Sequence, residues 1–140
     1  MEDRYLFKGK EKDSGKWLEW NAIAGIPHDA IILTNTICQC TGLKDKNGKL
    51  IWENDIISYQ RDNDDCPFPN KDTKKRLGKV FCSDFRATFA IGMGKNGSKS
   101  LNDDLWKYVQ NGNRVEVIGN IFDNKELLES EEWYDKRIYN

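Results

Sequence analysis

The chain has 140 residues, of which 38% are hydrophobic and 32% are charged, so it is long enough to enclose one hydrophobic core without disulfides or metals. Five Trp, five Tyr and six Phe supply apolar surface that offsets the entropy of ordering the chain, which excludes a disordered protein. Lys and Arg number 22 while Asp and Glu number 23, and the formal net charge of −1 excludes an overall basic field for non-specific nucleic-acid binding.

The N-terminal region is rich in charged residues and lacks the apolar h-region of a secretory signal. The longest apolar stretches, such as AIIL at 30–33, are far shorter than a membrane-spanning helix. We therefore expect a cytoplasmic protein made of one domain, residues 1–140. In that compartment the expected state of the cysteines is reduced thiols, at Cys38, Cys40, Cys66 and Cys82.

Strand-forming segments and turns dominate the first third of the chain. Ser14-Gly15 predicts a turn, because Ser-Gly is a strong break between periodic segments. The segment WLEWNAIAGI, residues 17–26, predicts a strand with a bend near Gly25. The β-branched residues of AIILTNTICQC, residues 30–40, predict a second strand after Pro27.

The segment QCTGLKDKNGKLIWENDII, residues 39–57, contains the strongest hairpin signal in the chain. Asn47-Gly48 lies between strand-forming residues, and both residue types tolerate the positive φ angles of a type I′ turn. The residues that follow, END at 53–55, predict a bend before the chain re-enters a sheet. A calcium loop around Gly48 is excluded, because its first and twelfth positions would be Leu43 and Asn54 rather than carboxylates.

The middle of the chain alternates between polar and apolar segments. Residues 60–77 form the longest polar stretch and contain two of the three prolines, which predicts a flexible loop. The segment GKVFCSDFRATFAIG, residues 78–92, then predicts a hairpin that turns near Ser83-Asp84.

The last third of the chain predicts a short helix, a strand and a C-terminal helix. Leu101, Leu105 and Val109 share one face of the first helix, and RVEVIGNIF, residues 114–122, alternates as a strand does. The second helix covers about residues 124–138, with Asp123 and Glu126 as a capping box at its start.

The segment GMGKNG, residues 92–97, matches the G-x-G-x-x-G pattern of dinucleotide-binding proteins. It follows a predicted strand, it precedes a predicted helix, and Glu116 lies about twenty residues further on. However, the segments before it predict hairpins rather than the βαβ units that this fingerprint requires. We favour a simple glycine-rich loop, and an enzyme or nucleotide binder acting through residues 92–97 is the weakest of the alternatives.

Metal ligands and catalytic residues are not predicted. Cys38 and Cys40 lack the C-x₂₋₄-C spacing of structural zinc sites, and His28 is the single histidine of the chain. His28 also has no evident Ser or Cys partner for nucleophilic catalysis. We therefore expect no cofactor, no metal and no enzymatic activity.

The basic segment KDTKKRLGK, residues 71–79, is the best candidate for contact with nucleic acid. Its basic residues are Lys71, Lys74, Lys75, Arg76 and Lys79. Nearby acidic residues weaken its field, at Asp62, Asp64, Asp65 and Asp72. We favour a solvated loop and keep nucleic-acid binding by residues 71–79 as the alternative.

Three segments together resemble a known family. These are LFKGKEKDSGKWLEW at 6–20, QCTGLKDKNGKLIWENDII at 39–57 and VEVIGNIFDNKELLE at 115–129, and they resemble conserved blocks of the YopX-like family of phage and prophage proteins. The chain departs from the family pattern at Cys40, where an aromatic residue is usual, at Asn54, where Gly is usual, and at Lys125, where Pro is usual.

The resemblance implies a mainly β (α+β) fold with a small SH3-like, barrel-like antiparallel core and peripheral short helices. It implies a phage or prophage setting and supplies no biochemical mechanism. Our first hypothesis is therefore a non-enzymatic binding or adaptor protein that engages a host or phage protein in the host cytoplasm. Its candidate surface residues are Trp52, Glu53 and Asp55, and self-association through open sheet edges is a further expectation.

Overall fold

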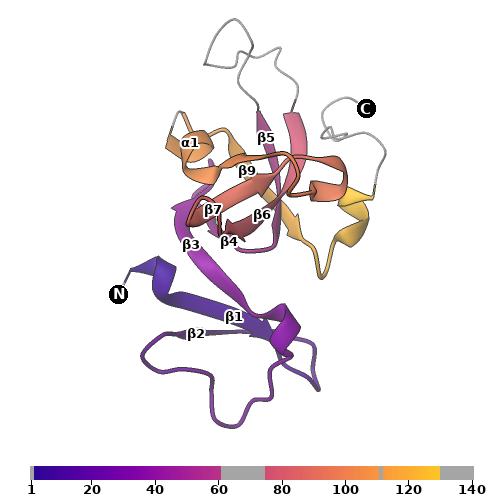
Figure 1. The fold of residues 1–140 in the computed structure, drawn as a ribbon. Coiled ribbons are helices and arrows are strands. Elements are labelled where there is room, and N and C mark those ends of the chain that lie inside the picture. Colours follow the sequence, from indigo (N-terminus) through magenta and orange to yellow (C-terminus); the bar gives the residue numbers. More distant parts are fainter. Residues whose placement is uncertain (1, 61–74, 111, 130–140) are drawn as a thin grey trace, which may run out of the picture.

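Nine short strands form two open antiparallel sheets in the computed structural model, which describes residues 2–60, 75–110 and 112–129 (Figure 1). The strand orders are β2-β1-β3-β4 in one sheet and β8-β7-β6-β5-β9 in the other. The mainly β class is confirmed. The prediction of a barrel-like core is wrong, because the sheets do not close. Within the described residues, the edge strands of each sheet do not pair with each other. The SH3-like character stays a prediction.

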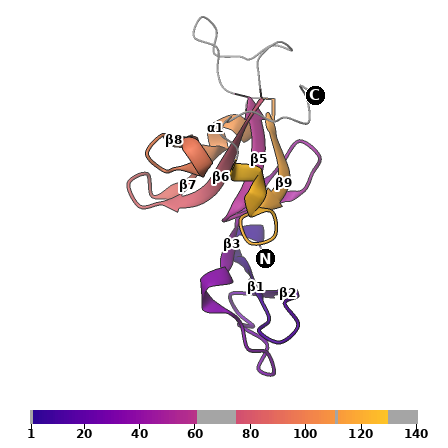
Figure 2. The same ribbon diagram turned by 90° about the vertical axis from the view of Figure 1, so that its right-hand side faces the viewer.

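The four-stranded sheet is built from the N-terminal part of the chain. It contains β1 (Leu6–Lys10), β2 (Trp17–Asn21), β3 (Cys38–Lys44) and β4 (Leu50–Trp52), with the 3₁₀ turns η1 (Asp3–Tyr5) and η2 (Thr34–Thr36). The turn predicted at Ser14-Gly15 joins β1 to β2, and Gly15 has a φ angle of +68° there. The β1–β2 hairpin forms one end of the molecule, and β3 leads from it toward the larger sheet (Figures 1 and 2).

The strand predicted over residues 30–40 begins only at Cys38. Before it, the hydroxyl of Thr36 donates to the Leu33 carbonyl at 2.6 Å and accepts the Lys10 amide hydrogen at 2.8 Å. These bonds hold residues 34–36 in the η2 turn against β1, although Thr34 and Thr36 favour a strand.

The five-stranded sheet is built from the rest of the chain. It contains β5 (Asp55–Gln60), β6 (Lys75–Ser83), β7 (Thr88–Gly92), β8 (Asn102–Asp104) and β9 (Val115–Asn120). The hairpin predicted near Ser83-Asp84 joins β6 to β7 and is confirmed. The loop predicted over 60–77 is wrong at its ends, because Gln60 pairs with Lys75 and Ser58 pairs with Leu77. Residues 61–74 lie outside the described residues.

The first predicted helix is shorter in the structure than the sequence predicts. The helix α1 (Leu105–Gln110) begins four residues later than expected, because Asn102–Asp104 pair with β7 as strand β8. After β9 the chain forms the 3₁₀ turns η4 (Lys125–Leu128), and the remainder of the predicted C-terminal helix lies outside the described residues. The capping box is wrong, because the Asp123 carboxylate binds Lys10 and Trp17 instead of the start of a helix.

The core lies between the larger sheet, strand β4 and helix α1. Five consecutive residues of β5, Asp55–Tyr59, are buried. Ile57 and Tyr59 belong to the main cluster, in which Tyr59 packs edge to face against Tyr108 of α1 with ring centroids 5.7 Å apart. A smaller cluster forms where β3 and β4 meet the first hairpin, with Cys38, Cys40 and Trp52 at its centre.

The Asn47-Gly48 hairpin between β3 and β4 is confirmed, but its turn is not type I′. Only Gly48 has a positive φ angle, +82°, and its amide donates to the Asp45 carbonyl at 3.0 Å. The buried Asp45 carboxylate organises this turn, because it accepts amide hydrogens from Asn47, Lys49 and Val117, each at 2.9 Å. Since Val117 belongs to β9, the same carboxylate links the hairpin to the second sheet.

We expect Asp45→Ala to lower the free energy of unfolding by about 3 kcal/mol, because it leaves three backbone donors without their acceptor. Urea unfolding followed by Trp fluorescence would measure the change. The control is Lys44→Ala at the end of β3, where the side chain is exposed and the expected loss is below about 0.5 kcal/mol. Equal losses in the two variants would contradict a linking role for Asp45.

Candidate functional site

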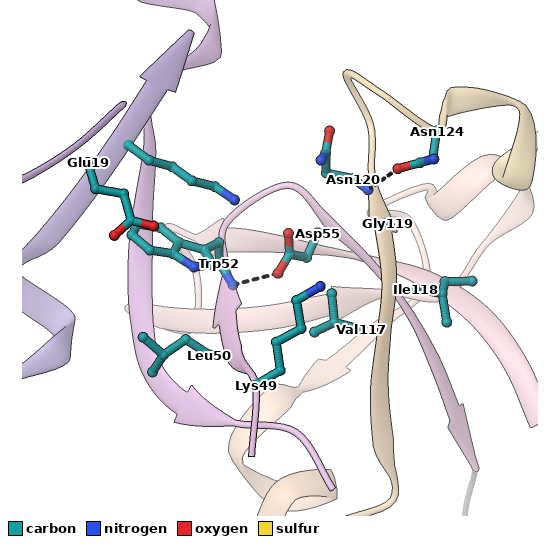
Figure 3. Close-up of a pocket in the computed structure, with 11 residues that line it drawn as sticks. Glu19, Lys49, Leu50, Trp52, Asp55, Val117, Ile118, Gly119, Asn120 and Asn124 are labelled. Carbon is teal, nitrogen blue, oxygen red and sulfur yellow. Dashed lines mark hydrogen bonds between the residues drawn. The ribbon is translucent and has the colours of Figure 1, made fainter. Parts of the chain in front are cut away.

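A cleft of about 560 Å³ lies between the two sheets, beside the edge strands β4 and β9 (Figure 3). This volume falls within the usual range of small-molecule sites. The cleft is lined by Lys8, Glu19, Lys49, Leu50, Trp52, Asp55, Val117, Ile118, Gly119, Asn120 and Asn124. Its residues therefore come from β1 and β2, from the β3–β4 hairpin, from β5 and from β9 with the residues after it.

Asp55 is the most buried ionisable residue of the cleft, with 3% of its surface exposed. Its Oδ2 accepts the Trp52 amide hydrogen at 2.8 Å across the turn between β4 and β5 (Figure 3). Burial raises the pKa of this carboxyl from 3.8 to about 6, although the hydrogen bond from Trp52 and the positive charges of Lys8 and Lys49 oppose the rise. A carboxyl of this kind changes its protonation near neutral pH.

Lys8 lies between two indole rings beside the cleft. Its Nζ is 4.7 Å from the centroid of Trp17 and 4.8 Å from that of Trp52. The two rings attract the ammonium group through their π faces, which fixes a positive charge close to Asp55. Lys8 forms no ion pair with a described carboxylate, so its hydrogen-bond donors face the cleft unpaired.

A polar network around Asp123 adjoins the cleft, because Asn120, which lines the cleft, donates to the Asp123 carboxylate at 3.1 Å. The Asp123 carboxylate pairs with Lys10 and accepts the indole N–H of Trp17 at 2.8 Å. Trp17 also packs edge to face against Phe122 at 5.8 Å. The hydrogen bonds from Lys10 and Trp17 hold the pKa of Asp123 at about 2. This network attaches the first hairpin to the segment that follows β9.

The predicted contact residues Trp52, Glu53 and Asp55 occupy the turn between β4 and β5. Trp52 and Asp55 are only 6% and 3% exposed, so these two are not exposed surface residues as expected; they line the cleft instead. Glu53 is half-buried, and its carboxylate accepts the Gln39 amide hydrogen at 3.2 Å. The burial arises because Trp52 packs in the cluster that includes Trp17 and because Asp55 pairs with Asn120 of β9; the local sequence reveals neither contact.

The predicted basic segment does not form one continuous patch within the described residues. Lys75 and Lys79 lie on one face of β6 and Arg76 on the other, while Lys71 and Lys74 lie outside the described residues. Burial and the neighbouring Lys99 lower the pKa of Lys79. Lys99 was not among the predicted contact residues, because it lies twenty residues away in the sequence.

The glycine-rich segment GMGKNG connects β7 to β8, two antiparallel neighbours in the sheet. A dinucleotide fingerprint needs a parallel strand and a crossover helix at this point, so the geometry does not fit it. The glycines have a packing role instead: a Cβ atom at Gly92 would collide with the Gly97 carbonyl, and Gly97 has a φ angle of +75°.

A second surface lies at the end of the molecule formed by the first hairpin. The loop of residues 22–33, called here the aliphatic loop, carries four exposed apolar side chains, Ile23, Ile26, Ile31 and Leu33. Ile23 is 84% exposed and Ile31 is 61% exposed. The sequence prediction missed this surface, because it assigned these residues to strands. Gly25 and Pro27 break the periodicity around them and were the available signal for a loop.

The fold and the cleft define a class of two-sheet, mainly β proteins with a polar inter-sheet cleft. The chain belongs to the family described as YopX protein, whose pattern matches residues 2–129. No curated protein matches the chain.

Among the residues that the structure describes, no helix combines the length and apolar character that crossing a bilayer requires. Likewise, no group of three or more His, Cys, Asp or Glu side chains within the described ranges is arranged to hold a metal ion.

We expect Asp55→Asn to change how stability depends on pH. The folded pKa of about 6 lies above the ordinary value of 3.8, so the wild-type gains stability below pH 4 and loses it as the pH rises through 6. The variant keeps an oxygen for the Trp52 amide and carries no charge. Relative to wild-type it should gain about 3 kcal/mol between pH 4 and pH 7, measured by urea unfolding.

The control for this comparison is Asp84→Asn in the exposed β6–β7 turn, for which no such gain is expected. A constant difference between Asp55→Asn and wild-type from pH 4 to pH 7 would contradict the raised pKa.

The Asp123 network gives the opposite dependence on pH. Its folded pKa of about 2 lies below 3.8, so its contribution is present above pH 4 and is lost as the pH falls toward 2. Because the Asp123 side chain is 38% exposed, solvent screening limits the loss in Asp123→Asn to about 1 kcal/mol at pH 7. Thermal unfolding at pH 7 and pH 2.5 measures it, with exposed Asp13→Asn as the control. A loss of the same size at both pH values would contradict the assignment.

Proposed function

We propose that this protein is a non-enzymatic binding or adaptor protein of phage or prophage origin that engages a protein partner through the aliphatic loop. The observation that carries the proposal is the exposure of Ile23, Ile26, Ile31 and Leu33 within twelve consecutive residues, 22–33. Contiguous exposed apolar surface on a soluble protein commonly marks a site of protein–protein interaction.

The energetics of the aliphatic loop support this function. Burying a fully exposed Ile or Leu side chain contributes about 1.5–3 kcal/mol. Ile23 and Ile31, at 84% and 61% exposed, therefore supply most of the free energy that a partner can gain here, while Ile26 and Leu33, at 44% and 39%, add less. The loop projects from the end of the molecule remote from the five-stranded sheet (Figures 1 and 2), where a partner can approach without obstruction by that sheet. Exposed His28 and Asp29 between the aliphatic residues add polar contacts at the rim.

Nucleic-acid binding through residues 71–79 remains the alternative. The proximity of Lys79 to Lys99 concentrates positive charge at one point of that surface. The other described basic residues, Lys75 and Arg76, lie on opposite faces of β6, so their positive charge is not concentrated on one surface. A host or phage protein is therefore the preferred partner.

The test is affinity capture of tagged protein from the producing cells, with and without nuclease, followed by mass spectrometry. We expect a stoichiometric protein partner that survives nuclease treatment and whose recovery falls at least about tenfold with Ile23→Ser/Ile31→Ser. Both side chains are largely exposed, so the double variant should unfold at the wild-type temperature.

The matched control is Phe85→Ser. Phe85 is 98% exposed in the β6–β7 turn, so this variant removes an exposed apolar side chain from the other sheet. Recovery of the partner should be unchanged. Capture that is lost with nuclease or with Lys74→Gln/Lys75→Gln/Arg76→Gln, and not with the loop variant, would transfer the function to nucleic acid. Equal loss with Phe85→Ser would also contradict the assignment to the loop.

A further inference from the structure

The cleft contains a carboxylate oxygen that no described residue engages. The Asp55 side chain is 97% buried, and its Oδ2 accepts the Trp52 amide hydrogen. No hydrogen bond or ion pair from any described residue reaches Oδ1, and Asp55 lines the cleft (Figure 3). Oδ1 is not an enclosed atom, so a ligand that enters the cleft can donate an N–H group to it.

The strand edges that line the cleft are closed to an added strand. The amide hydrogens of Trp52, Val117 and Asn120 are bonded to side chains, those of Asp55, Asp45 and Asn124 respectively. A peptide that paired with β4 or β9 would have to displace these bonds. The cleft therefore recognises a compact polar group rather than an extended backbone.

The Lys8 ammonium group supplies a hydrogen-bond donor in the cleft that contains the Asp55 carboxylate. Lys8 lines the same cleft, is held between the rings of Trp17 and Trp52, and lowers the pKa of Asp55 through its charge. The charged groups that face Asp55 are Lys8 from β1, Glu19 from β2, Lys49 before β4, and Asp45 from the preceding turn. The two positive charges balance the negative ones of Glu19 and Asp55 that line the cleft, which favours an uncharged ligand over an anion or a cation.

We propose that the cleft between β4 and β9 binds a primary carboxamide group, with its N–H on Asp55 Oδ1 and its carbonyl oxygen on Lys8 Nζ. A carboxamide presents one donor and one acceptor side by side and carries no charge, so it matches this pair. Leu50 and Val117 supply apolar walls for the adjoining methylene groups. The group belongs either to a small molecule or to a Gln or Asn side chain. The site is separate from the aliphatic loop and does not depend on it.

The experiment is a ¹H–¹⁵N NMR titration of the full chain at pH 7.5. Propionamide represents the small molecule and N-acetylglutamine N′-methylamide represents the side chain. We expect saturable chemical-shift changes of the Trp52 backbone amide, because this amide donates a hydrogen bond to the Asp55 carboxylate. The dissociation constants of both carboxamides should lie in the millimolar range. Tighter binding of the blocked glutamine would assign the group to a peptide. Equal binding would assign it to a small molecule.

Two variants test the two contacts. Asp55→Asn keeps an oxygen for Trp52 and places an NH₂ group in the cleft, and Lys8→Met removes the donor. Each should weaken propionamide binding at least about tenfold, which corresponds to one lost hydrogen bond. The controls Asp84→Asn and Lys12→Met are exposed and outside the cleft, and they should bind as wild-type does. Binding to wild-type should also weaken as the pH falls through 6, because protonated Asp55 no longer accepts at both oxygens.

Three results would overturn the proposal. These are the absence of saturable shifts with both carboxamides, equal shifts with N,N-dimethylpropionamide, which has no N–H donor, and stronger binding of acetate or methylguanidinium than of propionamide. If Asp55→Asn fails to fold, unchanged binding in Lys8→Met overturns the donor–acceptor pair by itself. Since none of these measurements uses the aliphatic loop, failure here leaves the proposed protein-binding function intact.

Discussion

The attachment of the β3–β4 hairpin to β9 holds the two sheets together. Asp45 makes this attachment with a single carboxylate, which bonds two amides of its own turn and one amide of β9. The Lys46 amide adds a bond to the Val115 carbonyl, and Asn54 bonds Val80 and Ile121 through its backbone. The cleft lies between the β3–β4 hairpin and β9, whose residues line it. The Asp45 carboxylate is thus one of several contacts that fix the distance between the hairpin and β9.

Hydrogen bonds to side chains also protect one edge strand of each sheet, β4 and β9. Strand edges with free amide hydrogens invite pairing with other chains, and proteins commonly cover them. Here Asp45, Asp55 and Asn124 each accept an amide hydrogen that an added strand would need. Two of the three acceptors, Asp45 and Asp55, are buried. Edge protection and the polar character of the cleft are thus two results of one set of side chains.

Local signals in the sequence predicted the turns well, and long-range contacts explain where prediction failed. Ser14-Gly15, Asn47-Gly48 and Ser83-Asp84 are turns because of their own residues, so they were found. By contrast, Asp123 bonds Lys10, 113 residues away, and Asp45 bonds Val117, 72 residues away. No local pattern records these pairs. The Asp123 capping box and the exposed location of Asp55 were wrong for this reason.

At the candidate site, too, local sequence signals were informative and long-range burial was not predicted. The sequence offered Trp52 and Asp55 as surface contacts, and it did not reveal their burial, because burial is a property of the assembled sheets. The aliphatic loop was missed for the converse reason. Its isoleucines favour a strand in sequence, and only the structure shows that their side chains are exposed among the described residues. Family membership adds a shared pattern over residues 2–129 and leaves the chemistry of both surfaces to be established by experiment.

The reactivity of the cysteines reports how often the first hairpin separates from the rest of the protein. Cys38 and Cys40 of β3 are fully enclosed and burial raises the pKa of both thiols, whereas Cys82 of β6 is exposed. An alkylating reagent should modify Cys82 at once and reach the two β3 thiols only when the first hairpin separates from the rest. The labelling rate of the two β3 thiols therefore measures the frequency of local unfolding in the small cluster around Trp52. A ligand in the cleft would lower the labelling rate of Cys38 and Cys40. A partner on the aliphatic loop would lower it only if it also stabilised the attachment of the first hairpin.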